Sequence, residues 1–302
     1  MSLPLHELVK RFGELTEEDY YILSIMERNL TKFREVPYQV ILQSVNFSEA
    51  KLERSLNKLH YLRLIWSPRG KKAAYVLNYL GLDVLALRTL SSKGIISGLG
   101  MPIGMGKEAD VYDAISREGK RFAVKFFRIG RPSFKKYERV RESLVRVHNY
   151  LEASIRAARM EFKALLMLKG KVPVPTPVYR TRHVVVTELF EGIELASLSK
   201  LDNAEEVLLK IIDAIKSAYE AGVVHRDLSA YNVLIKADGN IILIDWPQWV
   251  ERKHPQASLY LERDIRNILS FFARKWNIRN IPPEYGKIIE EITGKSINIY
   301  YE

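Results

Sequence analysis

One short segment, residues 225–232, constrains this chain more than any other. It reads His-Arg-Asp-Leu-Ser-Ala-Tyr-Asn and is followed by an apolar run that ends in Ile244-Asp245. Asp227 and Asn232 would lie on one loop, and a buried strand would bring Asp245 to the same place. Carboxylate and amide oxygens are the ligands that Mg²⁺ prefers. The pattern therefore predicts that Asp227 orients a nucleophile while Asn232 and Asp245 hold a metal ion.

The residues after this loop predict a small hairpin beneath the site. Residues 233–235 and 241–244 are short and apolar, and Asp238-Gly239-Asn240 between them is a typical turn. The alternative interpretation is a buried histidine beside a solvated acidic turn. Any one Asp alone would favour that alternative, but the complete ordered set argues against it.

A glycine-rich turn lies upstream, where a nucleotide site would need one. Residues 104–111 read Gly-Met-Gly-Lys-Glu-Ala-Asp-Val. They fit the phosphate-binding pattern G-x-G-x-x-G-x-V, except that Ala109 replaces the third glycine. Glycine-rich turns commonly have only a structural role. The evidence for phosphate binding is therefore the position of this turn in the chain, at the expected distance before the other motifs. Lys107 is either a cation beside the phosphates or a solvated loop charge.

A lysine follows this turn on the next apolar strand, Phe122-Ala123-Val124-Lys125. An unpaired ammonium there would be costly, so Lys125 is expected to meet a phosphate and a carboxylate. Glu161 is the expected partner, on a helix from about residue 151 to residue 169 with Ile155, Ala158, Phe162 and Leu165 as its apolar face. Glu152 competes with it, and ordinary helix-surface charge is the alternative for both.

Together these motifs resemble the RIO family of atypical protein kinases. The resemblance rests on the phosphate loop 106–112, the catalytic loop, and the metal loop Ile-Asp-Trp-Pro-Gln at 244–248, which stands where ordinary kinases have D-F-G. Residues 254–257, Tyr260 and Arg263-Asp264 resemble the second branch of the family, RIO kinase 2. The resemblance covers essentially the whole chain. It implies an α/β (α+β), bilobal, kinase-like fold with an N-terminal winged helix-turn-helix domain.

The resemblance also implies the cofactors, ATP with Mg²⁺ or Mn²⁺, and the roles of individual residues. Catalysis is assigned to Asp227, Lys125 and Asp245, and Asp264 is expected to brace the catalytic loop. Adenine would meet the carbonyl of Glu188 and the amide of Phe190. The nucleotide-binding candidates are Gly104, Gly106, Lys107, Glu108, Val111, Lys125, Glu161, Glu188, Phe190, Leu234 and Ile244.

Asp245 is not followed by an A-P-E motif or a long activation segment, so phosphorylation of peptides is not the expected activity. The resemblance implies autophosphorylation and ATP hydrolysis as a conformational switch, with a phosphoryl group on Asp245 as a hypothesis. A conventional serine/threonine kinase acting in trans stays open. So does a nucleic-acid-binding regulator with a non-catalytic kinase body.

The composition fits a globular protein with a basic surface. The chain has 302 residues, no cysteine and a net charge of +11. Disulfides and thiolate chemistry are excluded, and no apolar run reaches membrane-spanning length. The charge favours a polyanionic partner, although a lysine-rich surface of thermophilic type is the alternative. The expected partner is rRNA within a pre-small-subunit ribosomal particle, and a cytoplasmic monomer is expected.

The N-terminal residues 1–91 carry no kinase motif and predict a winged helix-turn-helix domain. Helices are expected over Glu17–Leu30, over residues 37–43 and after Ser48, followed by two strands around a basic turn at 67–72. The nucleic-acid candidates are Arg54, Lys58, Arg69, Lys71 and Lys72, which otherwise form a solvated face.

The remaining boundaries follow from the motifs. Residues 92–97 form a linker, residues 98–190 an N-lobe, and residues 191–302 a C-lobe. The N-lobe includes a mobile basic loop around residues 128–147. Ser133, between Arg131 and Lys135, is the candidate for autophosphorylation, and an unmodified surface serine is the alternative.

Overall fold

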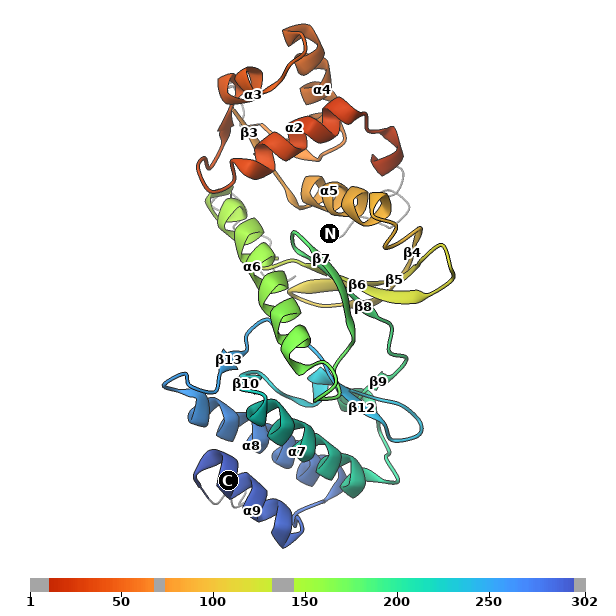
Figure 1. Ribbon diagram of the computed structural model, residues 1–302, viewed down its shortest axis with the longest axis vertical. Coiled ribbons are helices and arrows are strands. Elements are labelled where there is room, and N and C mark those ends of the chain that lie inside the picture. The colour runs from red at the N-terminus through yellow and green to blue at the C-terminus, as the bar shows by residue number, and fades with distance from the viewer. Residues whose placement is uncertain (1–10, 68–73, 132–143, 296–302) are drawn as a thin grey trace. The chain divides into compact units, whose positions relative to one another are not determined.

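The computed structural model describes residues 11–67, 74–131 and 144–295, without the side chains of residues 144–149. The chain divides into two compact units. The first unit comprises Met1–Arg159 and Tyr179–Val186, and the second comprises Met160–Val178 and Thr187–Glu302. The long helix α6 (Leu144–Leu168) runs from one into the other (Figure 1).

The first unit begins with helices and a small sheet. In order these are α2 (Glu17–Arg28), β1 (Val36–Pro37), α3 (Tyr38–Ser44), α4 (Glu49–Tyr61), β2 (Ile65–Trp66), β3 (Ala74–Leu77) and α5 (Tyr79–Ser92). The sequence predicted α2, α3, α4 and the strands β2 and β3, but neither β1 nor α5. The strands are antiparallel in the order β1-β3-β2. Leu52, Leu56 and Leu59 of α4 are buried, as their spacing predicted. This is a winged-helix arrangement.

A five-stranded sheet follows in the order β4-β5-β6-β8-β7. Its strands are β4 (Gly98–Met105), β5 (Ala109–Ile115), β6 (Arg121–Phe127), β7 (Pro177–Thr181) and β8 (Val184–Glu188). Two register shifts interrupt the pairing of β4 with β5, on either side of Pro102. Val111 and Lys125 are directly opposite each other on β5 and β6, so their side chains share one face of the sheet.

The buried face of helix α6 agrees only in part with the one that the sequence predicted. Ala158 and Leu165 are buried, but Ile155 and Phe162 are only partly buried. The buried positions are Leu151, Ser154, Ala158, Glu161, Ala164, Leu165 and Leu168. Apart from the neighbours Ala164 and Leu165, they follow one another in steps of three and four residues, so they form one helical face. Glu161, with 5% of its side chain exposed, therefore lies among the buried residues of the helix.

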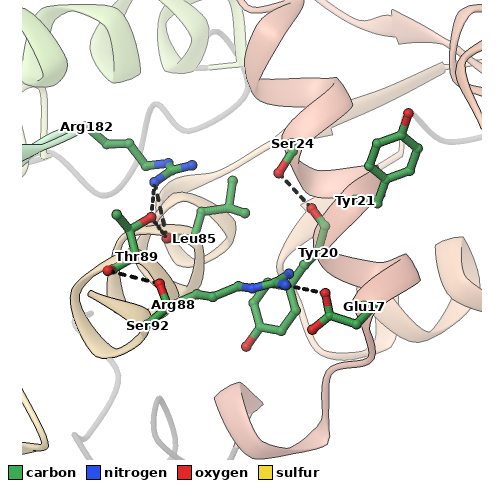
Figure 2. A pocket seen from close by; sticks show the side chains of 9 residues that line it. All are labelled: Glu17, Tyr20, Tyr21, Ser24, Leu85, Arg88, Thr89, Ser92 and Arg182. Atoms are coloured by element: carbon green, nitrogen blue, oxygen red, sulfur yellow. Dashed lines mark hydrogen bonds and ion pairs between the residues drawn. The ribbon is translucent and has the colours of Figure 1, made fainter. Parts of the chain in front are cut away.

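Arg182, in the turn between β7 and β8, fastens this sheet to the N-terminal helices. It adopts a positive φ of 50°. Its guanidinium donates to the Thr89 hydroxyl at 2.7 Å and to the Leu85 carbonyl at 3.2 Å, and it pairs with Glu27 at 2.8 Å. Figure 2 shows the contacts of Arg182 with Thr89 and Leu85. They lie beside a hollow of about 320 Å³ between α2 and α5, where Arg88 pairs with Glu17.

Beyond β8, the described residues of the second unit form short strands and three helices. Its elements are β9 (Ile193–Glu194), two 3₁₀ turns (Leu195–Ser197 and Ala230–Asn232), α7 (Ala204–Glu220), β10 (Val223–Val224), β11 (Val233–Ile235), β12 (Ile241–Leu243), β13 (Val250–Glu251), α8 (Ala257–Trp276) and α9 (Pro283–Thr293). Helices α7, α8 and α9 pack together (Figure 1). The predicted hairpin is confirmed, because β11 pairs with β12 in antiparallel register.

Candidate active site

The segment 225–232 forms a loop that α8 holds by one buried carboxylate. The Asp264 side chain accepts the Arg226 amide at 2.7 Å and the Leu228 amide at 3.1 Å. Asp227 lies between these two anchored residues and is itself exposed. The predicted bracing role of Asp264 is therefore confirmed, and the Asp227 carboxylate is presented to solvent from a fixed backbone.

Two residues of the site adopt backbone conformations that side chains disfavour. Arg226 has a φ of 74° and Asp245 a φ of 69°. Such conformations cost about 1–3 kcal/mol each and persist only where the surroundings impose them. For Arg226 the restraint includes Asp264 on its amide and the Arg263 guanidinium on its carbonyl. Strain of this kind is concentrated at functional sites.

His225 joins the catalytic loop to the metal loop. Its ring packs against Trp246 with the ring centres 4.3 Å apart. Nε2 lies 3.0 Å from the Ile244 carbonyl, and the Asp227 amide donates to Nδ1 at 3.4 Å. Because a carbonyl can only accept, Nε2 is the nitrogen that donates to Ile244. The histidine thus fixes the relative positions of Asp227 and Asp245.

The hairpin brings the two predicted metal ligands together. The Ile244 amide donates to the Asn232 carbonyl at 2.9 Å, so Asp245 follows directly after this link. The Asn232 side-chain amide donates from Nδ2 to the Asp227 carbonyl at 2.8 Å. This bond leaves Oδ1 of Asn232 as the atom for a metal.

This donor set fits Mg²⁺, which takes one or two protein oxygens together with water and phosphate oxygens. No group of three or more His, Cys, Asp or Glu side chains suited to a metal occurs among residues 11–67, 74–131 and 144–295. The pair Asn232 and Asp245 thus resembles a metal site in which a bound phosphate supplies further ligands. It differs from a metal site in which the protein supplies all the ligands.

Burial gives Asp264 an unusual proton affinity. Removal of its carboxyl from water raises its pKa from 3.8 to about 7, and the amides of Leu228 and Arg226 only partly oppose this. The group that braces the loop therefore changes charge near neutral pH.

In the glycine-rich turn, the backbone leaves little room for a side chain at Gly106 but not at Gly104. The Gly106 amide donates to the Ala109 carbonyl at 2.8 Å, and a Cβ on Gly106 would lie 3.3 Å from the same oxygen. At Gly104 the corresponding atom would make ordinary contacts with Val111. Lys107 and Glu108 are exposed at the tip. The turn thus closes on itself and leaves its tip accessible to a ligand.

Lys125 lies on β6 with its ammonium 4.8 Å from the centre of the Phe127 ring. Glu161 is buried and Glu152 is partly exposed, so Glu161 has the greater need of a cationic partner. Lys125 belongs to the first unit and Glu161 to the second. Their pairing stays a prediction.

The predicted adenine-binding residues lie near the start of the second unit. The Glu188 amide donates to the Thr176 carbonyl at 2.9 Å. A Cβ on Gly192 would lie 2.6 Å from the Phe190 ring, so this connector requires glycine. Leu234 lies opposite Glu194 on the neighbouring strand β9, and Ile244 directly follows β12. The adenine-binding roles of Glu188, Phe190, Leu234, Ile244 and Val111 stay predictions.

The sequence analysis missed the residues that anchor the phosphate loop. Arg131 donates to the Gly106 carbonyl at 3.0 Å, and the Arg128 amide donates to the Glu108 carbonyl at 2.6 Å. Both arginines were treated only as part of a basic loop. The available signal was Asp110, a carboxylate next to the apolar Ala109 and Val111 at the start of a strand, because a buried carboxylate requires a cation.

The predicted nucleic-acid residues differ in their surroundings. The Lys58 ammonium lies 2.8 Å from Asp19, whose carboxylate is buried. Arg54 is exposed, and its Nε donates to the Ala50 carbonyl at 3.3 Å. Arg69, Lys71, Lys72 and Ser133 lie outside the described residues.

Comparison with known proteins identifies the family of this chain. Residues 110–283 match the family described as RIO domain, and residues 12–93 match the one described as Rio2, N-terminal. A RIO-type serine/threonine-protein kinase Rio2 from Methanocaldococcus jannaschii is 35% identical over 227 residues, covering 72% of this chain and 84% of that protein. This chain belongs to the Rio2 branch of the RIO kinase family. The family comprises serine/threonine-protein kinases, so the chain is a kinase of RIO type.

Rio2 proteins of two other organisms extend the comparison. The crystal structure of the Rio2 kinase-ADP/Mg²⁺-phosphoaspartate complex from Chaetomium thermophilum has a TM-score of 0.82 and 27% identity, covering 96% of this chain and 91% of that one. The kinase rio2 of Dictyostelium discoideum is 32% identical, but the chain spans only 52% of its length. Over the described part of the chain, no helix is long and apolar enough to cross a membrane.

Proposed function

We propose that this chain binds ATP with Mg²⁺, phosphorylates itself and hydrolyses ATP as a conformational switch. The observation that carries the proposal is the catalytic loop, in which Asp264 and His225 fix the backbone around Asp227 beside Asn232 and Asp245. Support also comes from the Chaetomium thermophilum Rio2 structure, which contains ADP, Mg²⁺ and phosphoaspartate.

Each residue has a distinct task in this proposal. Asn232 and Asp245 hold Mg²⁺, which neutralises charge on the phosphates when it is bound. Asp227 orients the attacking group, and Lys125, with Glu161 as its partner, supplies a cation to the phosphates. The closed turn at Gly106 offers backbone amides to the same phosphates.

The attacking group that we propose for the hydrolytic reaction is the Asp245 carboxylate. One of its oxygens bonds to the γ-phosphorus while the bond from that phosphorus to the bridging oxygen breaks and ADP leaves. Water then attacks the phosphorus of the aspartyl phosphate, releases inorganic phosphate and restores the carboxylate. The neighbouring Asp227 carboxylate would accept the proton of this water.

A covalent label tests this reaction. After incubation with γ-labelled ATP and Mg²⁺, the protein should carry an acid-stable, hydroxylamine-sensitive label that maps to Asp245 and is missing from Asp245→Asn. Asp238→Asn is a matched control, because Asp238 is an exposed turn residue that bonds only locally to Asn240. Labelling of Asp245→Asn at the wild-type level would refute the assignment.

We also propose a role in maturation of the small ribosomal subunit, in the cytoplasm and as a monomer. The support is the net charge of +11 and the N-terminal winged helix, which suit a phosphate-rich partner. A salt-dependent gel shift with rRNA fragments should weaken when Arg69, Lys71 and Lys72 are neutralised together. Equal binding by that variant would exclude the wing from the contact.

A further inference from the structure

A cluster of buried charges connects the winged-helix part of the first unit to the five-stranded sheet. It consists of Asp83 on α5, Asp110 on β5, and Arg128 and Arg131 after β6. Arg128 binds Asp83 through two nitrogens, at 2.7 and 3.0 Å, and its Nε reaches Asp110 at 3.2 Å. Asp83 is 1% exposed and Asp110 0%. All four residues belong to one compact unit.

The cluster continues into the phosphate loop. Arg131 donates to the Asp110 carboxylate at 2.8 Å and, through the same nitrogen, to the Gly106 carbonyl at 3.0 Å. The Arg128 amide holds the Glu108 carbonyl on the other limb of the turn. A continuous path of charged contacts thus runs from helix α5 to both limbs of the loop that is expected to hold phosphates.

The charges of the cluster balance. Two guanidiniums oppose two carboxylates, while burial lowers the pKa of the adjacent His183 and keeps its ring neutral. Burial alone would raise the pKa of Asp83, but the Arg128 guanidinium and the His183 hydrogen bond outweigh it, so this pKa lies below its usual value. Asp83 is therefore ionised, and its charge is needed because a buried guanidinium without its counter-charge is strongly unfavourable.

We propose that Asp83 is a positioning residue for the phosphate loop, so that the winged-helix domain controls nucleotide affinity through Arg128, Asp110 and Arg131. Without the Asp83 charge, Arg128 has only Asp110 to neutralise it. Asp110 is then drawn away from Arg131, and the Gly106 carbonyl loses its fixed donor. The inference rests on the proposed nucleotide-binding function and assigns a control element to it.

The test measures affinity for an ATP analogue with Mg²⁺ by calorimetry. Asp83→Asn keeps the shape of the side chain and removes its charge, and we expect binding about fivefold to tenfold weaker. Glu27→Gln is the matched control. It weakens another arginine–carboxylate contact between the winged helix and the sheet, Arg182 with Glu27, which does not continue to the phosphate loop. It should leave affinity within about twofold of wild type.

Arg131→Gln is a second variant that does not depend on how well Asp83→Asn folds, because Arg131 is partly exposed. It should weaken binding to a similar extent. The double variant Asp83→Asn/Arg131→Gln should be little worse than either single variant, because both act through Asp110. Full additivity of the two losses would overturn the proposed path.

Hydrogen exchange measured without nucleotide tests the role of Asp83 independently of the proposed nucleotide binding. Amides 106–110 should exchange faster in Asp83→Asn than in wild type and Glu27→Gln, because the loop is less restrained. If wild type binds no nucleotide, the proposed function fails while exchange still tests the coupling. Equal exchange rates in Asp83→Asn and Glu27→Gln, or equal affinities, would overturn the role of Asp83.

Discussion

Replacement of Asp264 by alanine is predicted to disable the catalytic loop from a position outside it. The carboxylate is buried and accepts the amides of Arg226 and Leu228. Alanine leaves both N–H groups without this partner. It also removes a restraint that holds Arg226 at a φ of 74°, a conformation that the loop would otherwise tend to leave.

The magnitude follows from these contacts. A buried donor that loses its partner costs about 1–3 kcal/mol, so two such donors cost about 2–6 kcal/mol. Even the lower value corresponds to about a thirtyfold loss of the correctly shaped loop. Small proteins are stable by about 5–15 kcal/mol, so the variant is expected to fold and to lose activity. Asp264→Asn keeps one acceptor oxygen and should lose about half as much free energy.

The assay combines urea unfolding with phosphate release at saturating ATP. Asp264→Ala should lose free energy of unfolding by the amount above and release phosphate at least about thirtyfold more slowly. Asp213→Ala is the control, because it removes only an exposed hydrogen bond from Tyr285 and should cost less than about 0.5 kcal/mol. If Asp264→Ala behaved like this control in both measurements, the bracing role would be refuted.

Three further predictions concern charge and metal binding. Because the pKa of Asp264 is raised from 3.8 to about 7, its contribution to stability is complete below about pH 4 and is lost as the pH rises through 7. The free energy of unfolding of wild type relative to Asp264→Asn should therefore fall over that range. A difference that stays constant with pH would contradict this. Asn232→Ala should raise the Mg²⁺ concentration for half-maximal phosphate release by about tenfold or more, whereas an unchanged requirement would remove Asn232 from the metal site. Lys58→Ala should lower the free energy of unfolding by about 1–3 kcal/mol, because the buried Asp19 would lose its cation and keep the Thr16 amide. Arg54→Ala should change it by less than about 0.5 kcal/mol. A change in Lys58→Ala as small as that in Arg54→Ala, measured by urea titration, would show that the Lys58–Asp19 pair contributes nothing.

The local features of the site were predictable from sequence because they depend on neighbours along the chain. The hairpin after residue 232 was evident from two apolar runs around Asp238-Gly239-Asn240, and β11 and β12 form it. Helices α2 and α4 were equally evident from their spacing, whereas α5 was not predicted. Glu161, the residue expected to pair with Lys125, is buried on α6, and the pairing itself stays a prediction. The face assigned to that helix contained Ile155 and Phe162, which are only partly buried.

The long-range charge pairs were not predictable. Asp83 and Arg128 are 45 residues apart and belong to elements predicted as separate domains. Periodicity shows which face of a helix or strand is buried, but not which distant charge meets it. Lys58 illustrates the same gap, because its partner Asp19 is 39 residues away and the spacing of α4 gave no sign of it.

We propose that Asp227 on its braced loop directs transfer of the γ-phosphate of ATP. Release of γ-phosphate should be measured for wild type and Asp227→Ala, with and without immature small ribosomal subunits. We predict that Asp227→Ala binds ATP as wild type does but releases phosphate at least about a hundredfold more slowly in both conditions. Equal rates of release by the two proteins would contradict the assignment of this loop as the catalytic centre.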